Sequence, residues 1–198
     1  MREAALKALL ALFLAFLFFS SCKGPGGDKN KNNKNTAGQP NASKTGVPEQ
    51  AYGTPTAVGA PAPEITVFDP EGHPLNLQDL RGNVVVINFW ATWCGTCAME
   101  KPLLNRFYAG FRNNPHFRLI TVLYNDSAEN AKAYLAKHGY ALPFYMDPGS
   151  HASAAYGLTG VPESYVVDKR GILRGKAIGP VSWDAPKVSA FIKKLLKE

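Results

Sequence analysis

The pattern of hydrophobic and polar positions contains two apolar runs that predict strands in the interior of a domain. Residues 84–89 are nearly all apolar and β-branched, which is typical of a central strand covered on both faces. Residues 117–124 predict a second central strand of this kind. Weak alternation over 65–68 predicts a short strand, and Asp69–Gly72 predict a turn after it.

A first helix is predicted from Cys97 onward, because apolar side chains recur there at steps of four residues. We expect these side chains to form one buried face: Met99, Leu103, Phe107 and Phe111. Pro102 falls inside this helix and is expected to kink it, since proline lacks a backbone N–H and clashes with the preceding turn.

A second helix is predicted by its end signals. Asp126 and Glu129 have the spacing of a capping box, which opens a helix that runs through Lys137 and ends at Gly139. Residues 144–146 predict a short strand or loop.

The last part of the chain predicts a hairpin and a helix. Residues 165–168 and the chain from 172 onward form the arms of the hairpin, with a turn at 169–171. Residues 183–196 predict an amphipathic helix with inward side chains at Val188, Phe191, Ile192 and Leu195. This order of elements predicts an α/β fold with a mixed central sheet and helices on both faces.

The N-terminal segment 1–22 has the layout of an export signal. Positive charge at Arg2 and Lys7 precedes a wholly apolar stretch, and small residues lead to Cys22. The layout resembles a bacterial lipoprotein signal, in which the cysteine carries the lipid, although Phe19 stands where that pattern usually has leucine. An uncleaved anchor of about 18 residues and ordinary secretion are the alternatives. Under the first two readings the domain is extracytoplasmic, in the periplasm or cell envelope, and membrane-anchored.

Residues 23–60 predict a flexible tether. They are rich in Gly, Pro, Asn, Lys and Thr and poor in large apolar side chains, so they cannot bury enough surface to fold. A coil of this length reaches about 30–40 Å. The remaining residues 61–198 have the length of a single domain with one core.

The charge of the chain argues against nucleic acid as a partner. The formal net charge of +7 arises from 22 Lys and Arg against 15 Asp and Glu. These charges are spread over tether and domain and form no basic stripe interleaved with aromatic residues.

The segment Trp93-Cys94-Gly95-Thr96-Cys97 places two thiols where a predicted strand passes into a predicted helix. Unpaired N–H groups and the macrodipole at a helix N-terminus stabilise a thiolate on the first cysteine. Two intervening residues allow the cysteines to close on each other. We therefore expect Cys94 and Cys97 to cycle between dithiol and disulfide, with Trp93 flanking the pair.

Two other uses of the C-x-x-C spacing are disfavoured. Covalent haem attachment needs histidine after the second cysteine, and Ala98 stands there. A structural zinc site needs four ligands, but the only other cysteine is Cys22 and the four histidines show no paired ligand spacing. Lipidation of Cys22 also removes the odd third cysteine from thiol chemistry. No metal or cofactor is expected.

Two separated segments carry a resemblance to a known family. Residues 88–97 and the later Gly160-Val161-Pro162-Glu163-Ser164-Tyr165 resemble thioredoxin-fold proteins of the ResA/TlpA/CcmG (DsbE) group over residues 61–198. The resemblance implies a thioredoxin-like three-layer fold with a cis bond before Pro162, beside the redox pair. It also implies that the Val161 backbone pairs with an extended substrate segment. An ordinary turn proline is the alternative at Pro162.

The same resemblance assigns roles to two carboxylates. Glu100 lies three residues after Cys97, where the ResA-like group has an acidic residue near the active site, and a solvated helix carboxylate is the alternative. Glu163 resembles the glutamate of the CcmG-type motif, or is a surface charge at the groove. Thioredoxin has a buried aspartate where this chain has Asn88. An amide cannot accept a proton as a base, so Glu100 is expected to take that task.

The resemblance implies a reductase of protein disulfides outside the cytoplasm. In such a cycle Cys94 attacks the substrate disulfide and Cys97 resolves the mixed disulfide. The group's usual acceptor is apocytochrome c during cytochrome c maturation, and a DsbD/CcdA-type membrane protein is the implied electron donor.

Three alternatives stay open at this point. The protein is a general periplasmic disulfide reductase or isomerase, a peroxiredoxin-like peroxidase, or a copper-handling thioredoxin-fold module. A peroxidase would need a peroxidatic cysteine in a Thr-rich loop, and the copper module would need a spacing one residue longer than that between Cys94 and Cys97.

Overall fold

A computed structural model describes residues 56–198. The predicted export signal, Cys22 and nearly all of the predicted tether lie outside these residues. Within the described part of the chain, no helix has both the length and the hydrophobicity needed to cross a membrane.

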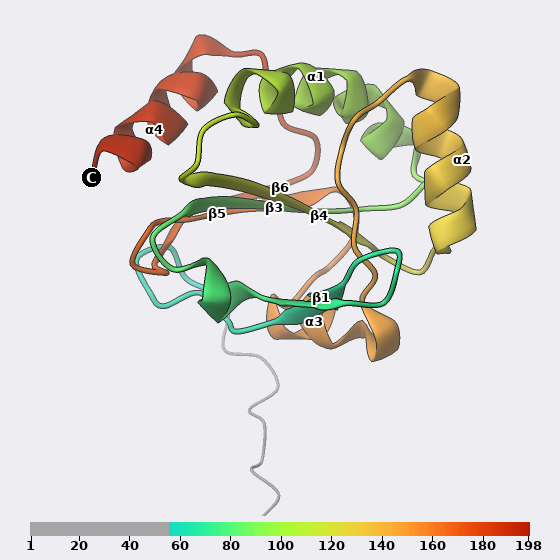
Figure 1. The fold of residues 1–198 in the computed structure, drawn as a ribbon, viewed down its shortest axis with the longest axis horizontal. Helices are drawn as coiled ribbons and strands as arrows, with labels where there is room; N and C mark the ends of the chain where they lie inside the picture. Colours follow the sequence, from blue (N-terminus) through green and yellow to red (C-terminus); the bar gives the residue numbers. More distant parts are fainter. Residues whose placement is uncertain (1–55) are drawn as a thin grey trace, which may run out of the picture. The chain divides into compact units, whose positions relative to one another are not determined.

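The centre of the domain is a four-stranded mixed sheet with the strand order β4-β3-β5-β6 (Figure 1). Strand β3 (Val84–Trp90) pairs in parallel with β4 (Phe117–Leu123) and antiparallel with β5 (Glu163–Val167). Strand β6 (Leu173–Ile178) completes the predicted hairpin with β5. All seven residues of β3 are buried, which confirms the prediction of a central strand covered on both faces.

Residues 117–124 were predicted to form a central strand, and this prediction is wrong about the place of the strand in the sheet. Strand β4 is an edge strand of the four-stranded sheet, although its apolar side chains are buried. A single parallel bridge between Val122 and Tyr145 covers part of its outer edge. An apolar sequence indicates that both faces of a strand are covered, but it does not indicate whether the strand pairs with one neighbouring strand or with two.

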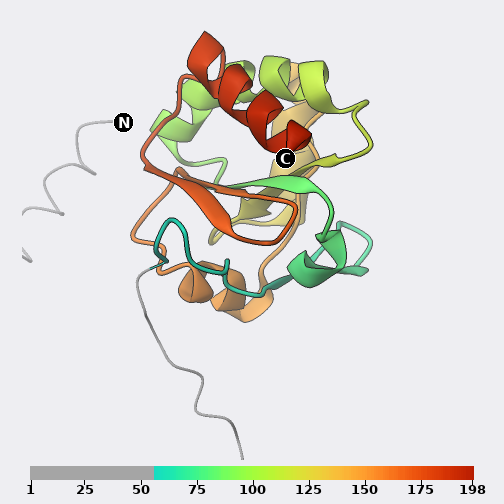
Figure 2. The same ribbon diagram turned by 90° about the vertical axis from the view of Figure 1, so that its left-hand side faces the viewer.

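Helices and a small hairpin cover the two faces of the sheet (Figures 1 and 2). One face carries three helices: α1 (Gly95–Phe111), α2 (Ala128–His138) and α4 (Pro186–Lys197). The other face carries α3 (His151–Ala155) and the two-stranded hairpin of β1 (Thr66–Phe68) and β2 (Pro74–Asn76). Short 3₁₀ turns lie at Leu77–Leu80 and Pro148–Ser150. The arrangement confirms the predicted mixed sheet with helices on both faces.

The side-chain alternation of β3 divides the core into two layers. Val84, Val86 and Trp90 face α1, α2 and α4, and they share a cluster with Cys94 and Cys97. The intervening side chains, including Ile87 and Phe89, face β1 and α3. A position on β3 or β5 therefore fixes whether a side chain lies on the cysteine face or on the opposite face.

The buried face of α1 differs from the predicted one. Met99 is 65% exposed, whereas Glu100, Lys101 and Leu104 are buried. Steps of four residues drift by about 40° each on a helix of 3.6 residues per turn, so the row that is buried at Phe107 has rotated outward at Met99. The helix is continuous through Pro102.

The start of α2 is also corrected. Its N-cap is Ser127, whose hydroxyl accepts from the Asn130 N–H at 3.1 Å, and not Asp126. Asp126 instead accepts two hydrogen bonds from Thr92, before the first cysteine. Gly139 ends the helix in the left-handed conformation, as predicted.

The two ends of the domain extend differently from the prediction. Helix α4 begins at Pro186, while Trp183 lies in the segment before it as a buried side chain. The domain also starts before residue 61, because Gly59 N–H donates to the Leu173 carbonyl at 2.7 Å and the Thr56 hydroxyl donates to the Tyr156 carbonyl at 3.1 Å.

Candidate active site

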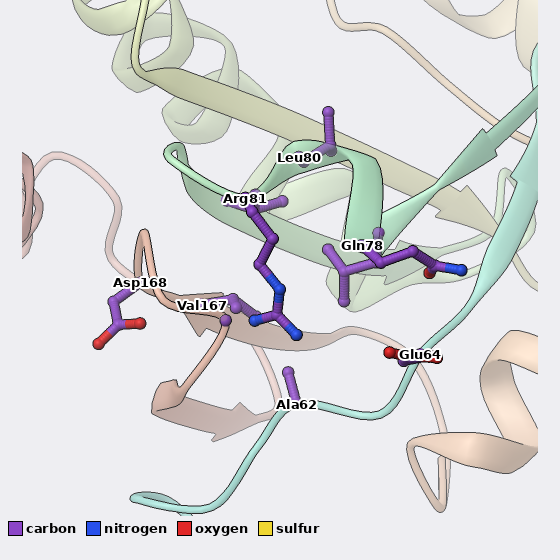
Figure 3. A pocket seen from close by; sticks show the side chains of 10 residues that line it. Ala62, Glu64, Gln78, Leu80, Arg81, Val167 and Asp168 are labelled. Atoms are coloured by element: carbon purple, nitrogen blue, oxygen red, sulfur yellow. The ribbon is translucent and has the colours of Figure 1, made fainter.

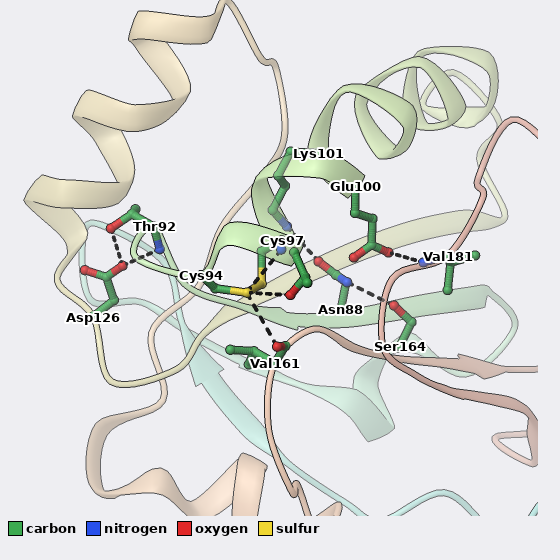
Figure 4. Close-up of a disulfide and its surroundings, with 11 residues drawn as sticks. Asn88, Thr92, Cys94, Cys97, Glu100, Lys101, Asp126, Val161, Ser164 and Val181 are labelled. Carbon is green, nitrogen blue, oxygen red and sulfur yellow. Dashed lines mark hydrogen bonds between the residues drawn. A yellow bond between two sulfur atoms is a disulfide. The ribbon is translucent and has the colours of Figure 1, made fainter.

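Cys94 and Cys97 form a disulfide at the junction between β3 and α1 (Figure 4). Cys94 is the N-cap residue of α1, and its Sγ accepts a hydrogen bond from the Cys97 N–H at 3.1 Å. The junction forms here because the apolar run of β3 ends at Trp90 and α1 begins at Gly95, a few residues later. The first sulfur therefore sits at the positive end of the helix macrodipole, where a thiolate is stabilised.

The two sulfurs differ in access to solvent. Cys94 keeps 6% of its surface exposed, while Cys97 has none. Cys94 is therefore the more exposed residue of the pair.

The loop before β5 faces the first sulfur. The Val161–Pro162 bond is cis, as the resemblance implies, and the Val161 carbonyl oxygen lies 3.5 Å from Cys94 Sγ. Among the described residues, no acceptor takes a hydrogen bond from the Val161 N–H. An extended peptide beside Cys94 would find a backbone donor there.

Trp93 precedes Cys94 in the chain and is largely exposed. Its side chain is 61% exposed, and its indole N–H donates to the Asn125 carbonyl at 3.1 Å. Next to it, the Thr92 N–H and hydroxyl both donate to Asp126 Oδ2 at 2.6 Å. Trp90, by contrast, is completely buried and belongs to the core.

Glu100 is a buried carboxylate and not a solvated one. It is 1% exposed, and its Oε1 accepts from the Trp183 indole N–H and from the Val181 N–H. Its Oε2 is buried without a hydrogen-bond partner among the described residues. Burial raises the pKa of Glu100 above its usual value, while the Trp183 hydrogen bond and the Lys101 ammonium oppose that rise.

Sequence reasoning missed Lys101. The side chain is completely buried, and its Nζ donates to Asn88 Oδ1 at 2.7 Å. Burial lowers the pKa of Lys101 from 10.5 to about 7, and the Glu100 carboxylate opposes this change. Its place four residues after Cys97 and three before Leu104 puts it on the buried face of α1, and this spacing was the available signal.

Asn88 connects this helix to the sheet. Its amide oxygen accepts from Lys101, and its amide nitrogen donates to the Ser164 hydroxyl at 2.9 Å. Figure 4 shows Asn88 beside the disulfide, pointing toward both Glu100 and Lys101. A polar group of four side chains therefore lies beside the redox pair: Asn88, Glu100, Lys101 and Ser164.

Glu163 lies away from the disulfide. It alternates with Ser164 along β5, so it shares the opposite face of the sheet with Tyr165. Its side chain is completely buried and accepts from the Thr159 N–H and hydroxyl and from the Tyr165 hydroxyl at 2.5–3.0 Å. Burial raises its pKa, but these hydrogen bonds outweigh burial and hold the pKa of Glu163 below its usual value. Glu163 is therefore no surface charge, and it holds the loop that carries Val161 and Pro162.

Replacing Glu163 with leucine is expected to lower the free energy of unfolding by about 1–3 kcal/mol, because the two Thr159 donors lose their acceptor inside the protein. Urea unfolding measures the change. Glu71→Leu, at an exposed turn position, is the matched control. Equal stability of the two variants would show that the Glu163 hydrogen bonds contribute nothing.

A separate small cavity lies between the 3₁₀ turn at Leu77–Leu80 and the turn that joins β5 to β6 (Figure 3). Arg81 points into it between Gln78 and Val167, and its Nη1 donates to the Arg170 carbonyl at 2.5 Å. Gly171 has a φ of +78°, which favours glycine, and a Cβ there would displace the Arg81 guanidinium because Nη1 would lie 0.7 Å away. The cavity measures about 10 Å³, which holds about one water, so it is no substrate site. Within residues 56–198 no cluster of three His, Cys, Asp or Glu side chains is placed to hold a metal ion.

The chain is similar in sequence to proteins that are named for thiol-disulfide exchange. The model of the AhpC/TSA family matches residues 58–176. The thiol-disulfide oxidoreductase ResA of Bacillus thuringiensis (strain Al Hakam) is 29% identical over 138 residues, which cover 70% of this chain and 78% of ResA. The thiol:disulfide interchange protein DsbE of Allochromatium vinosum is 34% identical over 128 residues, covering 63% of this chain and 68% of DsbE.

Solved structures agree with the sequence relatives. A thiol:disulfide interchange protein of the thioredoxin family from Chlorobium tepidum TLS superposes with a TM-score of 0.57 at 26% identity, over 71% of this chain and 96% of that one. The thioredoxin domain of a thiol-disulfide oxidoreductase from Bacteroides vulgatus gives 0.60 at 25% identity, over 69% and 98% of the two chains. With a disulfide at the strand–helix junction and these relatives, the chain belongs to the AhpC/TSA family and is a thioredoxin-fold thiol-disulfide oxidoreductase of the ResA and DsbE type.

Proposed function

We propose that the protein is a membrane-tethered, extracytoplasmic reductase of disulfides in exported proteins. The observation that carries this proposal is the unequal access of the two sulfurs: Cys94 is reachable at the N-terminus of α1, and Cys97 is sealed behind it. This asymmetry suits a substrate that docks at Cys94 and is then released by Cys97.

The reaction has two exchange steps. The Cys94 thiolate attacks one substrate sulfur, the substrate S–S bond breaks, and the departing thiolate takes a proton from water. Cys97 then loses its proton and attacks Cys94 Sγ. The mixed disulfide breaks, the second substrate thiolate leaves and is protonated, and the Cys94–Cys97 disulfide remains. Two electrons pass from the protein to the substrate.

Glu100 is assigned as the group that accepts the Cys97 proton. It lies one helical turn after Cys97, it is buried, and its Oε2 has no hydrogen-bond partner among the described residues. Asn88 occupies the position of thioredoxin's aspartate and cannot act as a base. Trp93, Val161 and Pro162 are assigned to substrate binding around Cys94, and Glu163 supports their loop from the other face of the sheet.

The direction of electron flow is proposed from the residues between the cysteines. Thr96 replaces the proline of thioredoxin and brings no imidazole, which the strongly oxidising DsbA-type enzymes have at this place. We expect a reduction potential near the thioredoxin range of about −270 mV. Reoxidised protein would then receive electrons from a DsbD/CcdA-type membrane protein, and a tether raises the effective concentration of the two partners.

Apocytochrome c is the proposed substrate, and cytochrome c maturation the proposed process. Both come from the likeness to the ResA and DsbE group. The tether at residues 23–60 and the lipid on Cys22 come from the sequence alone. Mass spectrometry of the mature N-terminus decides between a lipidated Cys22 and an uncleaved anchor.

The Cys97→Ser variant is expected to trap the substrate, because Cys94 still attacks but no thiol resolves the mixed disulfide. The full-length variant, expressed in its own cell envelope, would be purified without reductant, and the bound proteins released with dithiothreitol and identified by mass spectrometry. The double variant Cys94→Ser/Cys97→Ser is the matched control and should release nothing.

The identity of the trapped protein tests each level of the proposal. Apocytochrome c supports the proposed substrate. Many unrelated exported proteins would replace it with a general reductase or isomerase. A variant that traps no protein, together with a wild-type protein that consumes peroxide, would overturn the proposal in favour of a peroxidase.

A further inference from the structure

A lysine with no exposed surface lies beneath the disulfide. Lys101 projects from the second turn of α1 into the core, where Nζ lies 4.1 Å from the centre of the Trp90 ring and donates one hydrogen bond, to Asn88. An ammonium group removed from water is costly unless charge and hydrogen bonds compensate it. Leucine or methionine at this position would fill the same space without that cost. The lysine therefore calls for a role other than packing.

Within residues 56–198, few charged and titratable groups surround Lys101. On α1 they are Glu100, the adjacent residue, and Cys97, one turn earlier. Strand β3 contributes only the neutral side chains of Asn88 and Trp90, and β5 contributes Ser164 through Asn88. Tyr134 of α2 packs against Trp90 at 5.7 Å between ring centres. Before α4, Trp183 faces Glu100 with its neutral indole.

Glu100 is the one carboxylate in this group, and both of its hydrogen bonds, from Trp183 and Val181, are accepted by Oε1. Its Oε2 has no hydrogen-bond partner within residues 56–198. The Coulomb attraction of Lys101 is among the effects that lower the pKa of Glu100 against the effect of burial. Figure 4 shows the two side chains converging on Asn88 from adjacent positions of the helix.

We propose that Lys101 is a positioning residue for the resolving step, in which its ammonium keeps Glu100 ionised and thereby ready to accept the proton of Cys97. This inference rests on the proposed function, since it concerns the same step. Lys101 touches neither the substrate nor the reacting sulfurs in this scheme.

The step balances without a further reactant. The proton of the Cys97 thiol passes to the Glu100 carboxylate, and the resulting thiolate attacks Cys94 Sγ. The S–S bond to the substrate breaks, and the substrate thiolate leaves with the electron pair and takes a proton from water. Below about pH 7, where Lys101 carries its charge, it keeps its proton throughout this step. When the disulfide has formed, Glu100 returns its proton to solvent.

Lys101→Met tests the inference, because methionine keeps the apolar volume and removes the charge. Single-turnover oxidation of the reduced full-length protein by a peptide disulfide, followed by tryptophan fluorescence between pH 5 and 9, gives the rate of resolution. The acid limb of the wild-type profile should move to higher pH by at least one unit in the variant. At a pH on that limb, this shift is a tenfold or greater loss of rate. Lys132→Met, exposed on α2, should keep the wild-type profile.

A double-mutant cycle separates this role from a structural one. In a Glu100→Gln background the Lys101→Met change should cause no further shift of the profile, because no carboxylate remains to be kept ionised. An unchanged acid limb in Lys101→Met, even with a lower melting temperature, would overturn the inference. Should the methionine variant not fold, Lys101→Gln replaces it with the same expected shift. A wild-type protein without reductase activity would instead refute the proposed function.

Discussion

Replacing Cys94 with serine is expected to abolish disulfide reduction, with a fall in rate on the order of 1000-fold or more. Cys94 is the only accessible sulfur of the pair, and serine at the N-cap preserves the start of α1 while removing the nucleophile. Cys97 cannot substitute for it, since it has no exposed surface. Reduction of insulin by the full-length protein, with dithiothreitol as the electron source, measures the loss.

The control for this variant is Cys22→Ser. It removes the third cysteine of the chain and should reduce insulin at the wild-type rate in detergent solution. Substantial activity in Cys94→Ser would mean that another thiol attacks the substrate, and the order of the two exchange steps would have to be reversed.

Replacing Glu100 with glutamine is expected to slow resolution of the mixed disulfide by about 100-fold, the usual scale for loss of a general base. Glutamine can still accept from Trp183 and Val181, so the loss reports proton transfer more than packing. The first step, attack by Cys94, should be nearly unaffected. Stopped-flow measurement of mixed-disulfide formation and decay separates the two steps.

The pH dependence of the same variant gives a second readout. Burial places the pKa of Glu100 above its usual 4.5, so the ionised base is lost as the pH falls through a value higher than 4.5. The wild-type profile should therefore have an acid limb above pH 4.5, and Glu100→Gln should lack it. Glu129→Gln, exposed on α2, should keep it. An acid limb that survives in Glu100→Gln would assign the base to another group.

Local sequence patterns predicted the redox junction well. The β-branched run before Cys94 and the helix after it are neighbours in the sequence, so their pattern defines the strand, the N-cap and the two sulfurs together. The cis bond before Pro162 was implied only by the resemblance, because Gly-Val-Pro alone also suits an ordinary turn. Its place beside Cys94 depends on the pairing of β3 with β5, which no local pattern encodes.

The missed features have physical reasons as well. Strand β2 contains Pro74 and is only three residues long, and α3 is a five-residue helix, so neither spans two periods of its hydrophobic pattern. Lys101 escaped notice because lysine is rarely buried, and composition says nothing of the partners that compensate it. The sheet face of Glu163 could have been predicted, because the two-residue period of a strand places it on the same face as Tyr165 and Val167.

The segment 56–62, which leads into the domain, determines where a pulling force on the leading chain would enter the fold. Backbone hydrogen bonds join Gly59 and Ala60 to Leu173, and Ala62 to Gly171, while Thr56 binds the end of α3 at Tyr156. A pull on the chain ahead of Thr56 would thus be borne by the hairpin of β5 and β6 and by α3. Helix α1 takes no part in these hydrogen bonds, but the loop at Val161 that leads into β5 lies against Cys94, so the hairpin is the element through which such a load would meet the redox pair.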